Sequence, residues 1–440
     1  MDNMYLGMSY HRRRRRKKGP IFIILILSAL ALGFGGYKLS KFIFEKNETE
    51  AETDKVQEHE TAVWASADPT SDTNEVYMLW TEPKVTEAPV IEESDDEDVW
   101  MKDFVDTRER VTSKGIYISS DYINKRFDEA LALLDSTELN TMVIDIINDN
   151  GYVTYMMDYD VVREAGICTP TISNISETIR ILKEHNVYLI ARIVSFRDSL
   201  LAVKKPELAL KNKDGSIFRD SSGFAWLNPY EDKVWDYLTE ICKRCVGLGF
   251  NEVNLDYIRF STDKGLENVD FGPKAETMSR IDVITEGIRK ICETIKPMGA
   301  FVSCDVYGAI ISSKVDSRIT GQSYFNMAQY LDYICPMVYP SHYGDGYYGL
   351  DHPDCHPYDL VYHALLDSKK NLYMIDPEVN KAEVRPWLQD FTASWLKNHL
   401  KYGKDEVRAQ INGVYDAGYS QWLLWNAAII YTKDALEKAN

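Results

Sequence analysis

The sequence lacks the short motifs that mark several common enzyme classes. No glycine-rich fingerprint of a dinucleotide-binding or phosphate-binding loop follows its first predicted strand, and no Gly-x-Ser-x-Gly elbow is present. These absences argue against a nucleotide-binding fold and against a serine hydrolase. We therefore predict no cofactor.

Cysteine is too sparse and too scattered for a disulfide framework. The 440 residues contain seven cysteines, an odd number. Only Cys242 and Cys245 lie close together, on a predicted helix with no second pair at zinc-finger spacing. We interpret this pair as buried thiols.

Basic residues are outnumbered by acidic ones. The formal net charge is −18, which argues against a nucleic-acid partner because phosphates require a basic surface. Aromatic residues, by contrast, are abundant, with 28 Tyr and 9 Trp. Their flat rings suit sugar faces, although protein interfaces favour the same residues.

The first 44 residues predict a membrane anchor. Residues 1–19 form a basic tail that contains the run Arg12 to Lys18, and the apolar segment 20–44 follows directly. Basic residues before an apolar segment orient it with its N-terminus in the cytoplasm. We expect an uncleaved, single-pass transmembrane signal anchor that places the rest of the chain outside the cell membrane. The alternative is a cleaved signal peptide, because Ala29-Leu30-Ala31 resembles a small-x-small cleavage site.

Residues 45–110 have the composition of a spacer. They include 21 acidic and six basic residues, a net charge of −15, and few apolar ones. Such a segment cannot bury enough apolar surface to offset its ordering entropy. We predict a disordered acidic linker that holds the following domain away from the membrane.

Residues 111–440 alternate short apolar runs with helical patterns. Near-continuous apolar strands separated by helices imply a parallel sheet covered on both faces, and eight of them favour a closed (β/α)8 TIM barrel over an open doubly wound sheet. The predicted strands are residues 115–119, 142–147, 187–194, 249–260, 300–306, 333–339, 384–391 and 421–425.

Polar residues recur near the C-terminal ends of these strands, where the active sites of such barrels lie. We predict three catalytic residues, Asp256, Asp305 and Asp390. The residues predicted to bind substrate are Arg192, Trp226, Arg259, Tyr339, His342, Trp387, Gln389, Trp425 and Asn426.

Asp256 and Asp305 end adjacent predicted strands, which makes them the natural catalytic pair. Glycoside hydrolysis usually needs two carboxyl groups, one protonated as general acid and one ionised as nucleophile or base. Adjacent strands lie about 4.8 Å apart, which is nearer the roughly 5.5 Å carboxyl separation of retaining enzymes than that of inverting ones. We assign Asp256 as nucleophile or base and Asp305 as general acid, with Arg192 or Arg259 keeping one carboxylate ionised.

A metal site is a competing interpretation of the segment that holds His342, His352, Asp354, Cys355 and His356. The spacing of His352 and His356 resembles a metal-binding pair only on a helix. Pro353 and Pro357 favour a loop instead, so we assign no metal ligands.

Several segments of residues 115–431 resemble a known family, the putative glycoside hydrolase domain family of unknown function, a barrel in the broad glycosidase superfamily. The matching motifs are residues 191–194, 225–230, 255–260, 303–308, 336–343, 385–391 and 424–426. One departure lies on the second strand, where Ile147, Asn148 and Asp149 stand in place of an expected Lys-containing acidic turn, so we expect no catalytic role there.

The sequence therefore predicts an outward-facing glycoside hydrolase that acts on an extracellular or cell-wall polysaccharide. Two alternatives remain open. One is a non-catalytic carbohydrate-binding barrel, which needs the aromatic residues but not the paired carboxyl groups. The other is a metal-dependent polysaccharide deacetylase.

Overall fold

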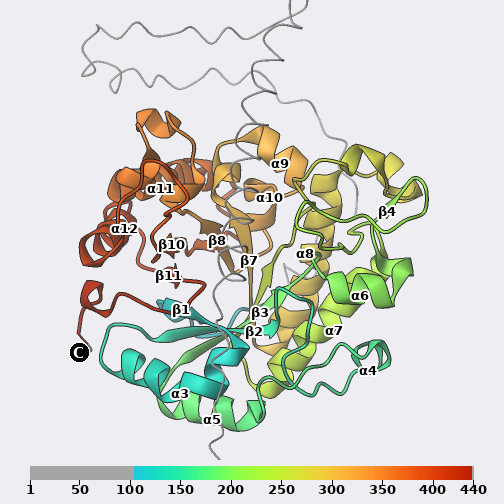
Figure 1. Cartoon of the computed structure of the whole chain (residues 1–440), viewed down its shortest axis with the longest axis horizontal. Coiled ribbons are helices and arrows are strands. Elements are labelled where there is room, and N and C mark those ends of the chain that lie inside the picture. Colours follow the sequence, from blue (N-terminus) through green and yellow to red (C-terminus); the bar gives the residue numbers. More distant parts are fainter. Residues whose placement is uncertain (1–103, 439–440) are drawn as a thin grey trace, which may run out of the picture. The chain divides into compact units, whose positions relative to one another are not determined.

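Parallel strands form a closed barrel in residues 104–438, the part of the chain that the computed structural model describes (Figure 1). The strands pair in the order β10-β11-β1-β2-β3-β5-β7-β8-β9, and β10 also pairs with β8, which closes the sheet. They are β1 (Lys114–Ile118), β2 (Thr141–Ile147), β3 (Tyr188–Val194), β5 (Glu252–Asp256), β7 (Phe301–Tyr307), β8 (Tyr333–Met337), β9 (Glu383–Val384), β10 (Trp387–Gln389) and β11 (Trp422–Trp425). The predicted eight-stranded α/β barrel is confirmed.

The seventh strand position is filled by two short strands instead of one. The predicted strand 384–391 is wrong in its extent, because Arg385 and Pro386 separate β9 from β10. Proline has no backbone N–H to donate to a ladder, which favours such an interruption. β9 pairs with the start of β8, whereas Trp387 of β10 pairs with Met337 at its end.

The predicted strand 249–260 is also shorter in the structure. β5 stops at Asp256, because Tyr257 has φ +51°, a left-handed conformation that few residues with side chains adopt. Gly249, at φ +103°, ends the preceding helix, and β5 begins at Glu252, later than predicted. β5 therefore ends at Asp256, at the C-terminal end of the barrel strands.

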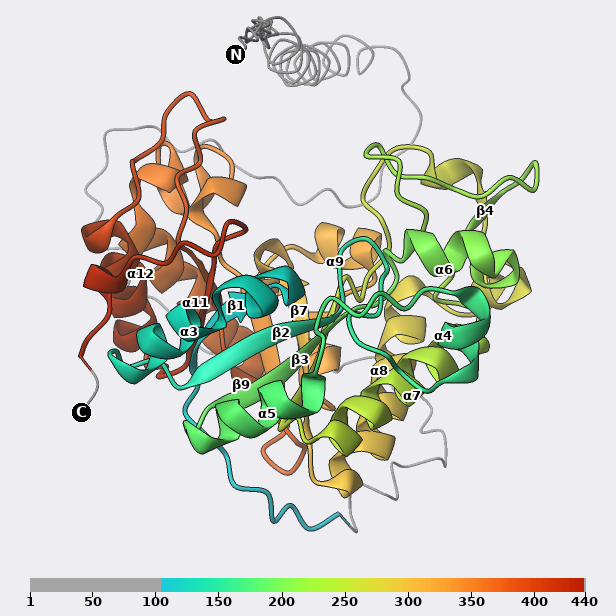
Figure 2. The same ribbon diagram turned by 60° about the horizontal axis from the view of Figure 1, so that its bottom comes forward.

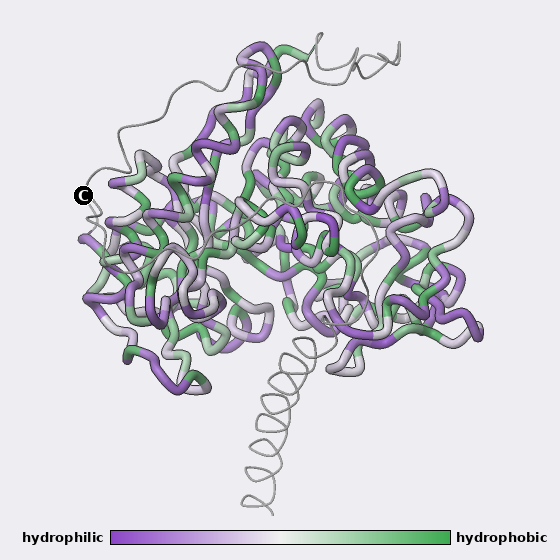
Figure 3. The backbone as a smooth tube through the Cα atoms, turned by 90° about the horizontal axis from the view of Figure 1, so that it is seen from above, coloured by the Kyte–Doolittle hydropathy of each residue, from purple (hydrophilic) through white to green (hydrophobic). Residues whose placement is uncertain are grey.

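Helices cover the outside of the barrel, and Figure 2 shows α3 and α5 beside β2 and β3. Their buried residues recur on one face, and Figure 3 shows hydrophobic and hydrophilic stretches alternating along the helical turns. The helices that follow strands are α3 (Ser120–Asp135), α5 (Ile175–Glu184), α7 (Asp232–Leu248), α8 (Arg280–Ile295), α11 (Pro357–Tyr373) and α12 (Lys404–Asp416).

The longest connections lie at the C-terminal ends of the strands. They contain four short helices and a two-stranded antiparallel sheet. These elements are α4 (Asp160–Ala165), α6 (Ser199–Lys204), α9 (Lys314–Thr320), α10 (Tyr324–Ala328), β4 (Lys211–Asn212) and β6 (Val269–Asp270). Cys242 and Cys245 of α7 are buried free thiols, as predicted.

The interior of the barrel contains charged groups. Residues alternate between the two faces of a strand, so Val253 and Leu255 of β5 face the helices while Glu252 faces inward. Arg385 donates a hydrogen bond from Nη2 to Glu252 at 2.9 Å, and both side chains are inaccessible to solvent. The remaining nitrogens of this guanidinium have no hydrogen-bond acceptor in the described part of the chain.

The end of the predicted linker packs against the N-terminal ends of the barrel strands. Residues 104–110 fall within the segment 45–110, but they are ordered in the structure. Arg108 is nearly buried and donates hydrogen bonds to both carboxylate oxygens of Asp332 and to the carbonyl of Ala300. Ala300 directly precedes β7 and Asp332 directly precedes β8. The chain therefore joins the barrel at the N-terminal ends of its strands, which we call the floor.

No helix within residues 104–438 is long and apolar enough to cross a bilayer. The predicted anchor, residues 20–44, and most of the predicted linker lie outside the described residues.

We expect Glu252→Gln to destabilise the protein by about 3–5 kcal/mol, because it leaves the Arg385 cation buried without a counter-charge. Urea denaturation measures the change in free energy of unfolding. Asp121→Asn is the control, since it breaks an exposed ion pair with Lys125 on α3 and should change stability little. Equal effects of the two substitutions would contradict the role of the buried pair.

Candidate active site

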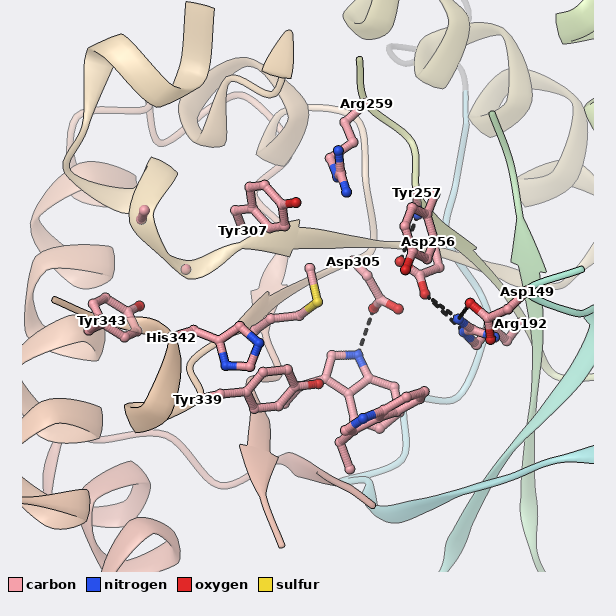
Figure 4. A pocket seen from close by; sticks show the side chains of 15 residues that line it. Asp149, Arg192, Asp256, Tyr257, Arg259, Asp305, Tyr307, Tyr339, His342 and Tyr343 are labelled. Atoms are coloured by element: carbon pink, nitrogen blue, oxygen red, sulfur yellow. Dashed lines mark hydrogen bonds and ion pairs between the residues drawn. The ribbon is translucent and has the colours of Figure 1, made fainter. Parts of the chain in front are cut away.

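A cavity of about 410 Å³ opens at the C-terminal ends of the strands (Figure 4). Its position is the one at which barrel enzymes bind substrate. Three carboxyl groups, two arginines and several aromatic rings line it. The lining residues are Asp149, Arg192, Asp256, Tyr257, Arg259, Asp305, Tyr307, Gly308, Ala309, Met337, Tyr339, His342, Tyr343, Trp387 and Trp425.

Asp305, on β7, is a buried carboxyl with neutral hydrogen-bond partners. Its Oδ1 accepts hydrogen bonds from Asn254 Nδ2 at 2.9 Å and from Trp387 Nε1 at 2.7 Å. Burial, followed by the negative charge of Asp256, raises the pKa of Asp305 to about 8. The group is therefore protonated at neutral pH.

Asp256, at the end of β5, has a cationic partner. Its Oδ2 accepts two hydrogen bonds from Arg192, from Nε at 2.9 Å and from Nη2 at 2.6 Å. Its Oδ1 accepts a third from the backbone N–H of Tyr257, at 2.6 Å. Charge-assisted bonds of this kind are typical of an ionised carboxylate.

Two further carboxyl groups share the Arg192 guanidinium. Asp145, on β2, accepts a hydrogen bond from Nη1 at 2.6 Å and another from the hydroxyl of Tyr117 at the same distance. Burial outweighs these contacts and raises the pKa of Asp145 to about 6. Asp149, whose side chain is 41% exposed, accepts from Nη2 at 3.2 Å, and this cation outweighs partial desolvation and lowers the pKa of Asp149.

The sheet register sets Asp256 and Asp305 side by side. Leu255 pairs with Cys304 in the ladder between β5 and β7, so the next residue of each strand carries one of the two carboxyl groups. Figure 4 shows both side chains at the same wall of the cavity. Arg192 bonds Asp256, whereas only neutral groups bond Asp305. The pair can therefore consist of an ionised Asp256 and a protonated Asp305.

Aromatic side chains form a further part of the cavity lining. The indoles of Trp387 and Trp425 meet edge to face, with centroids 5.8 Å apart. Tyr339 packs beside His342 at 5.2 Å, and burial lowers the pKa of His342, so its imidazole is neutral at pH 7. Flat rings and neutral donors suit the apolar faces and hydroxyls of a sugar.

Four residues predicted for the site lie outside the cavity lining. Asp390 accepts hydrogen bonds at its two carboxylate oxygens from the backbone N–H and the hydroxyl of Thr432. Asn426 donates to the backbone carbonyls of Asp390 and Ile430. Both side chains hold the loop that follows the last strand, and the structure does not bring Asp390 into the cavity lining with Asp256 and Asp305.

The other two residues outside the cavity lining are Gln389 and Trp226. Gln389 is fully buried, where it accepts from the Ser341 backbone and donates to Asp354. Trp226 is buried beneath the mouth, with its indole N–H donating to Asp220 at 3.0 Å. Neither side chain lines the cavity. The position of Gln389 at a strand end did not specify its partners, and Trp226 lies in the long connection between β3 and α7.

Sequence reasoning missed several lining residues. Tyr257, Tyr307 and Tyr343 resemble core aromatics in sequence, and Asp149 was set aside because its turn departs from the family pattern. The clearest missed signal is Asp149 itself, a carboxylate just past the end of β2 at the same edge as Asp256.

The histidines of the candidate metal segment point to other partners. His352 contacts Asp345 at 3.0 Å and Asn398 at 2.7 Å, and Asp354 is buried against Gln389. His352 and His356 flank a short 3-10 helix, as the prolines predict, and do not share an α-helix. Within residues 104–438, no cluster of three metal-ligating side chains is present.

A sequence model of the family described as "Putative glycosyl hydrolase domain" matches residues 115–431, the range over which the sequence resembles that family. No curated protein matches the chain. The structure resembles that of a hypothetical protein from Ruminiclostridium thermocellum ATCC 27405, with 33% identity over 43% of this chain and 97% of that chain, at a TM-score of 0.40.

It also resembles the PgaB (BpsB) glycoside hydrolase domain from Bordetella bronchiseptica. The match has 12% identity over 75% of this chain and 100% of that chain, at a TM-score of 0.52. This similarity shows a shared fold.

We expect Asp305→Asn to become more stable relative to the wild type as the pH rises from about 5 to about 8.5. The pKa of Asp305 is higher in the folded protein than the value of about 3.9 in an unfolded chain, so the wild type loses stability over this range. Asparagine does not ionise. Urea denaturation at both pH values, with the exposed Asp128→Asn of α3 as control, measures this. A difference independent of pH would contradict the raised pKa.

Proposed function

Given that this chain belongs to the family described as "Putative glycosyl hydrolase domain", we propose that it hydrolyses an extracellular or cell-wall polysaccharide through Asp256 and Asp305. The predicted enzyme class, a glycoside hydrolase, agrees with that family. The observation that carries the proposal is the pairing of a protonated carboxyl with an arginine-bound carboxylate on neighbouring strands.

Asp305 is the general acid. Its proton moves to the glycosidic oxygen as the bond to the anomeric carbon breaks, and its raised pKa keeps that proton available at neutral pH. The Asn254 and Trp387 hydrogen bonds fix Oδ1. This leaves Oδ2 as the atom that carries the proton.

Asp256 is the nucleophile or base that acts at the anomeric carbon. In a retaining reaction its carboxylate attacks the anomeric carbon, and water then hydrolyses the glycosyl-enzyme while Asp305 accepts the water proton. Adjacent strands support this outcome, because they lie about 4.8 Å apart. Arg192 holds Asp256 in position through two hydrogen bonds to Oδ2.

The sugar rings pack against the aromatic wall. Trp387 and Trp425 offer ring faces and edges, while the Tyr339 hydroxyl and the neutral His342 are positioned to bond sugar hydroxyls. Trp387 has a second task, since its N–H positions the catalytic acid. Arg259 completes the group of predicted binding residues that line the cavity.

We expect Asp305→Asn and Asp256→Asn each to lower kcat by roughly 10²-fold or more, the usual contribution of a positioned acid or base. In the wild type, activity should fall as the pH rises through the pKa of Asp305. Release of reducing ends from cell-wall and capsule polysaccharides measures both effects.

Asp390→Asn is the matched control, because its carboxylate bonds Thr432 outside the cavity, and it should keep activity. Full activity in either catalytic variant would overturn the assignment. Sugar binding without any hydrolysis by the wild type would favour the carbohydrate-binding alternative.

The proposal also includes the location of the enzyme. Residues 1–19 would lie in the cytoplasm, 20–44 would span the cell membrane, and the rest would face outward, as the basic tail and apolar segment predict.

The mass of the mature protein from isolated membranes tests this. We expect the full-length mass in the membrane fraction, and a mature chain that starts after Ala31 would show the cleaved signal peptide instead.

A further inference from the structure

Arg259 lies at the mouth of the cavity, three residues after Asp256. Only 7% of its surface is exposed, yet it lines the cavity. Figure 4 shows its guanidinium pointing into the cavity between Tyr257 and Tyr307. Tyr257, in the left-handed conformation, ends β5 between Asp256 and Arg259.

Neutral groups hold this guanidinium in place. Nη1 donates to the carbonyl oxygen of Phe260 at 3.0 Å. The ring of Tyr307 lies 4.4 Å from Cζ, and the rings of Trp226 and Tyr257 lie 5.2 Å from it. These contacts fix the plane of the guanidinium but leave its charge uncompensated.

Carboxylates compensate the neighbouring arginines. Arg192 bonds three of them, and Arg197 lies 3.5 Å from Asp220 and 3.8 Å from Asp149. Arg259 forms no ion pair within residues 104–438. Its Nε and Nη2 find no acceptor there, and neither atom is sealed from solvent.

We propose that Arg259 binds a carboxylate of the substrate, and that the enzyme acts on glycans that contain an acidic sugar such as a uronic acid. The identity of the reaction rests on the proposed function, whereas the carboxylate subsite rests on Arg259. A planar carboxylate matches the two parallel N–H groups of a guanidinium edge and receives charge-assisted bonds from both. It also supplies the counter-charge that a nearly buried cation requires.

The remaining charges limit the kind of acidic glycan. Residues 111–440 include 35 basic and 46 acidic residues, a net charge of −11. This field repels a densely charged polyanion. Arg259 beside mainly aromatic side chains suits a glycan in which an acidic sugar alternates with neutral sugars.

Binding to oligosaccharides that contain glucuronate or galacturonate tests the proposal, each compared with its carboxyl-reduced neutral form. Calorimetry on the Asp305→Asn variant measures affinity without turnover. A charged hydrogen-bonded contact should make the acidic form bind roughly 10- to 100-fold more tightly. Arg259→Gln in the same background should abolish this preference, and Arg259→Lys should keep part of it, since lysine retains the charge but not the fork.

Arg280 provides a matched control. It donates from Nη1 to the carbonyl of Ile319 at 2.9 Å and lies 5.0 and 5.1 Å from the rings of Phe260 and Phe271, but it does not line the cavity. Arg280→Gln should leave the preference intact. Equal affinity of acidic and reduced forms, no binding of any acidic oligosaccharide, or a preference that survives Arg259→Gln would each overturn the proposal.

The two proposals fail in different ways. A preference for acidic oligosaccharides that depends on Arg259, without hydrolysis by the wild type, would support the subsite and overturn the proposed reaction. Hydrolysis of neutral glycans with no acidic preference would do the reverse.

Discussion

The mouth of the barrel depends on one buried cation. Arg192 is almost inaccessible to solvent, and its guanidinium is shared by Asp145, Asp149 and Asp256. A buried charge that loses its partner costs several kcal/mol, so the cation and its carboxylates require one another. The cluster ties β2, β3 and β5 together at their C-terminal ends. It also gives two aspartates different environments. Arg192 bonds Asp256, whereas Asp305 receives hydrogen bonds only from neutral donors in the described residues.

The cavity lining consists of a neutral aromatic part and a charged part. Trp387 and Trp425 form an apolar wall whose rings are fixed by packing and by the Trp387 hydrogen bond to Asp305. On the charged side, the carboxylates and Arg192 form hydrogen bonds mostly with one another. Rings that hold a cation without neutralising it, as around Arg259, are therefore the exception among the described residues at this mouth.

Much of the barrel follows from the sequence, because a parallel strand and its covering helix each carry a periodic apolar signal. The pairing of Asp256 with Asp305 follows from strand adjacency alone. Asp390 shows where this reasoning ends. Its strand-end position is as predicted, but the hydroxyl and backbone of Thr432, which a linear pattern cannot bring near it, occupy its oxygens. Tyr307 was missed for the opposite reason, since an aromatic residue that lines a cavity has the same local sequence as one in a core.

The contact of Arg108 with Asp332 and Ala300 fixes the end of the barrel at which the preceding chain joins the domain. Both partners precede β7 and β8, so the chain joins the barrel at the end opposite the cavity. Tension on the preceding chain would act first on the buried ion pair of Arg108 and Asp332, at the end of the barrel away from the Asp256 and Asp305 side chains. The cavity end of the barrel, with Asp256 and Asp305, therefore lies away from the point at which this segment joins the domain.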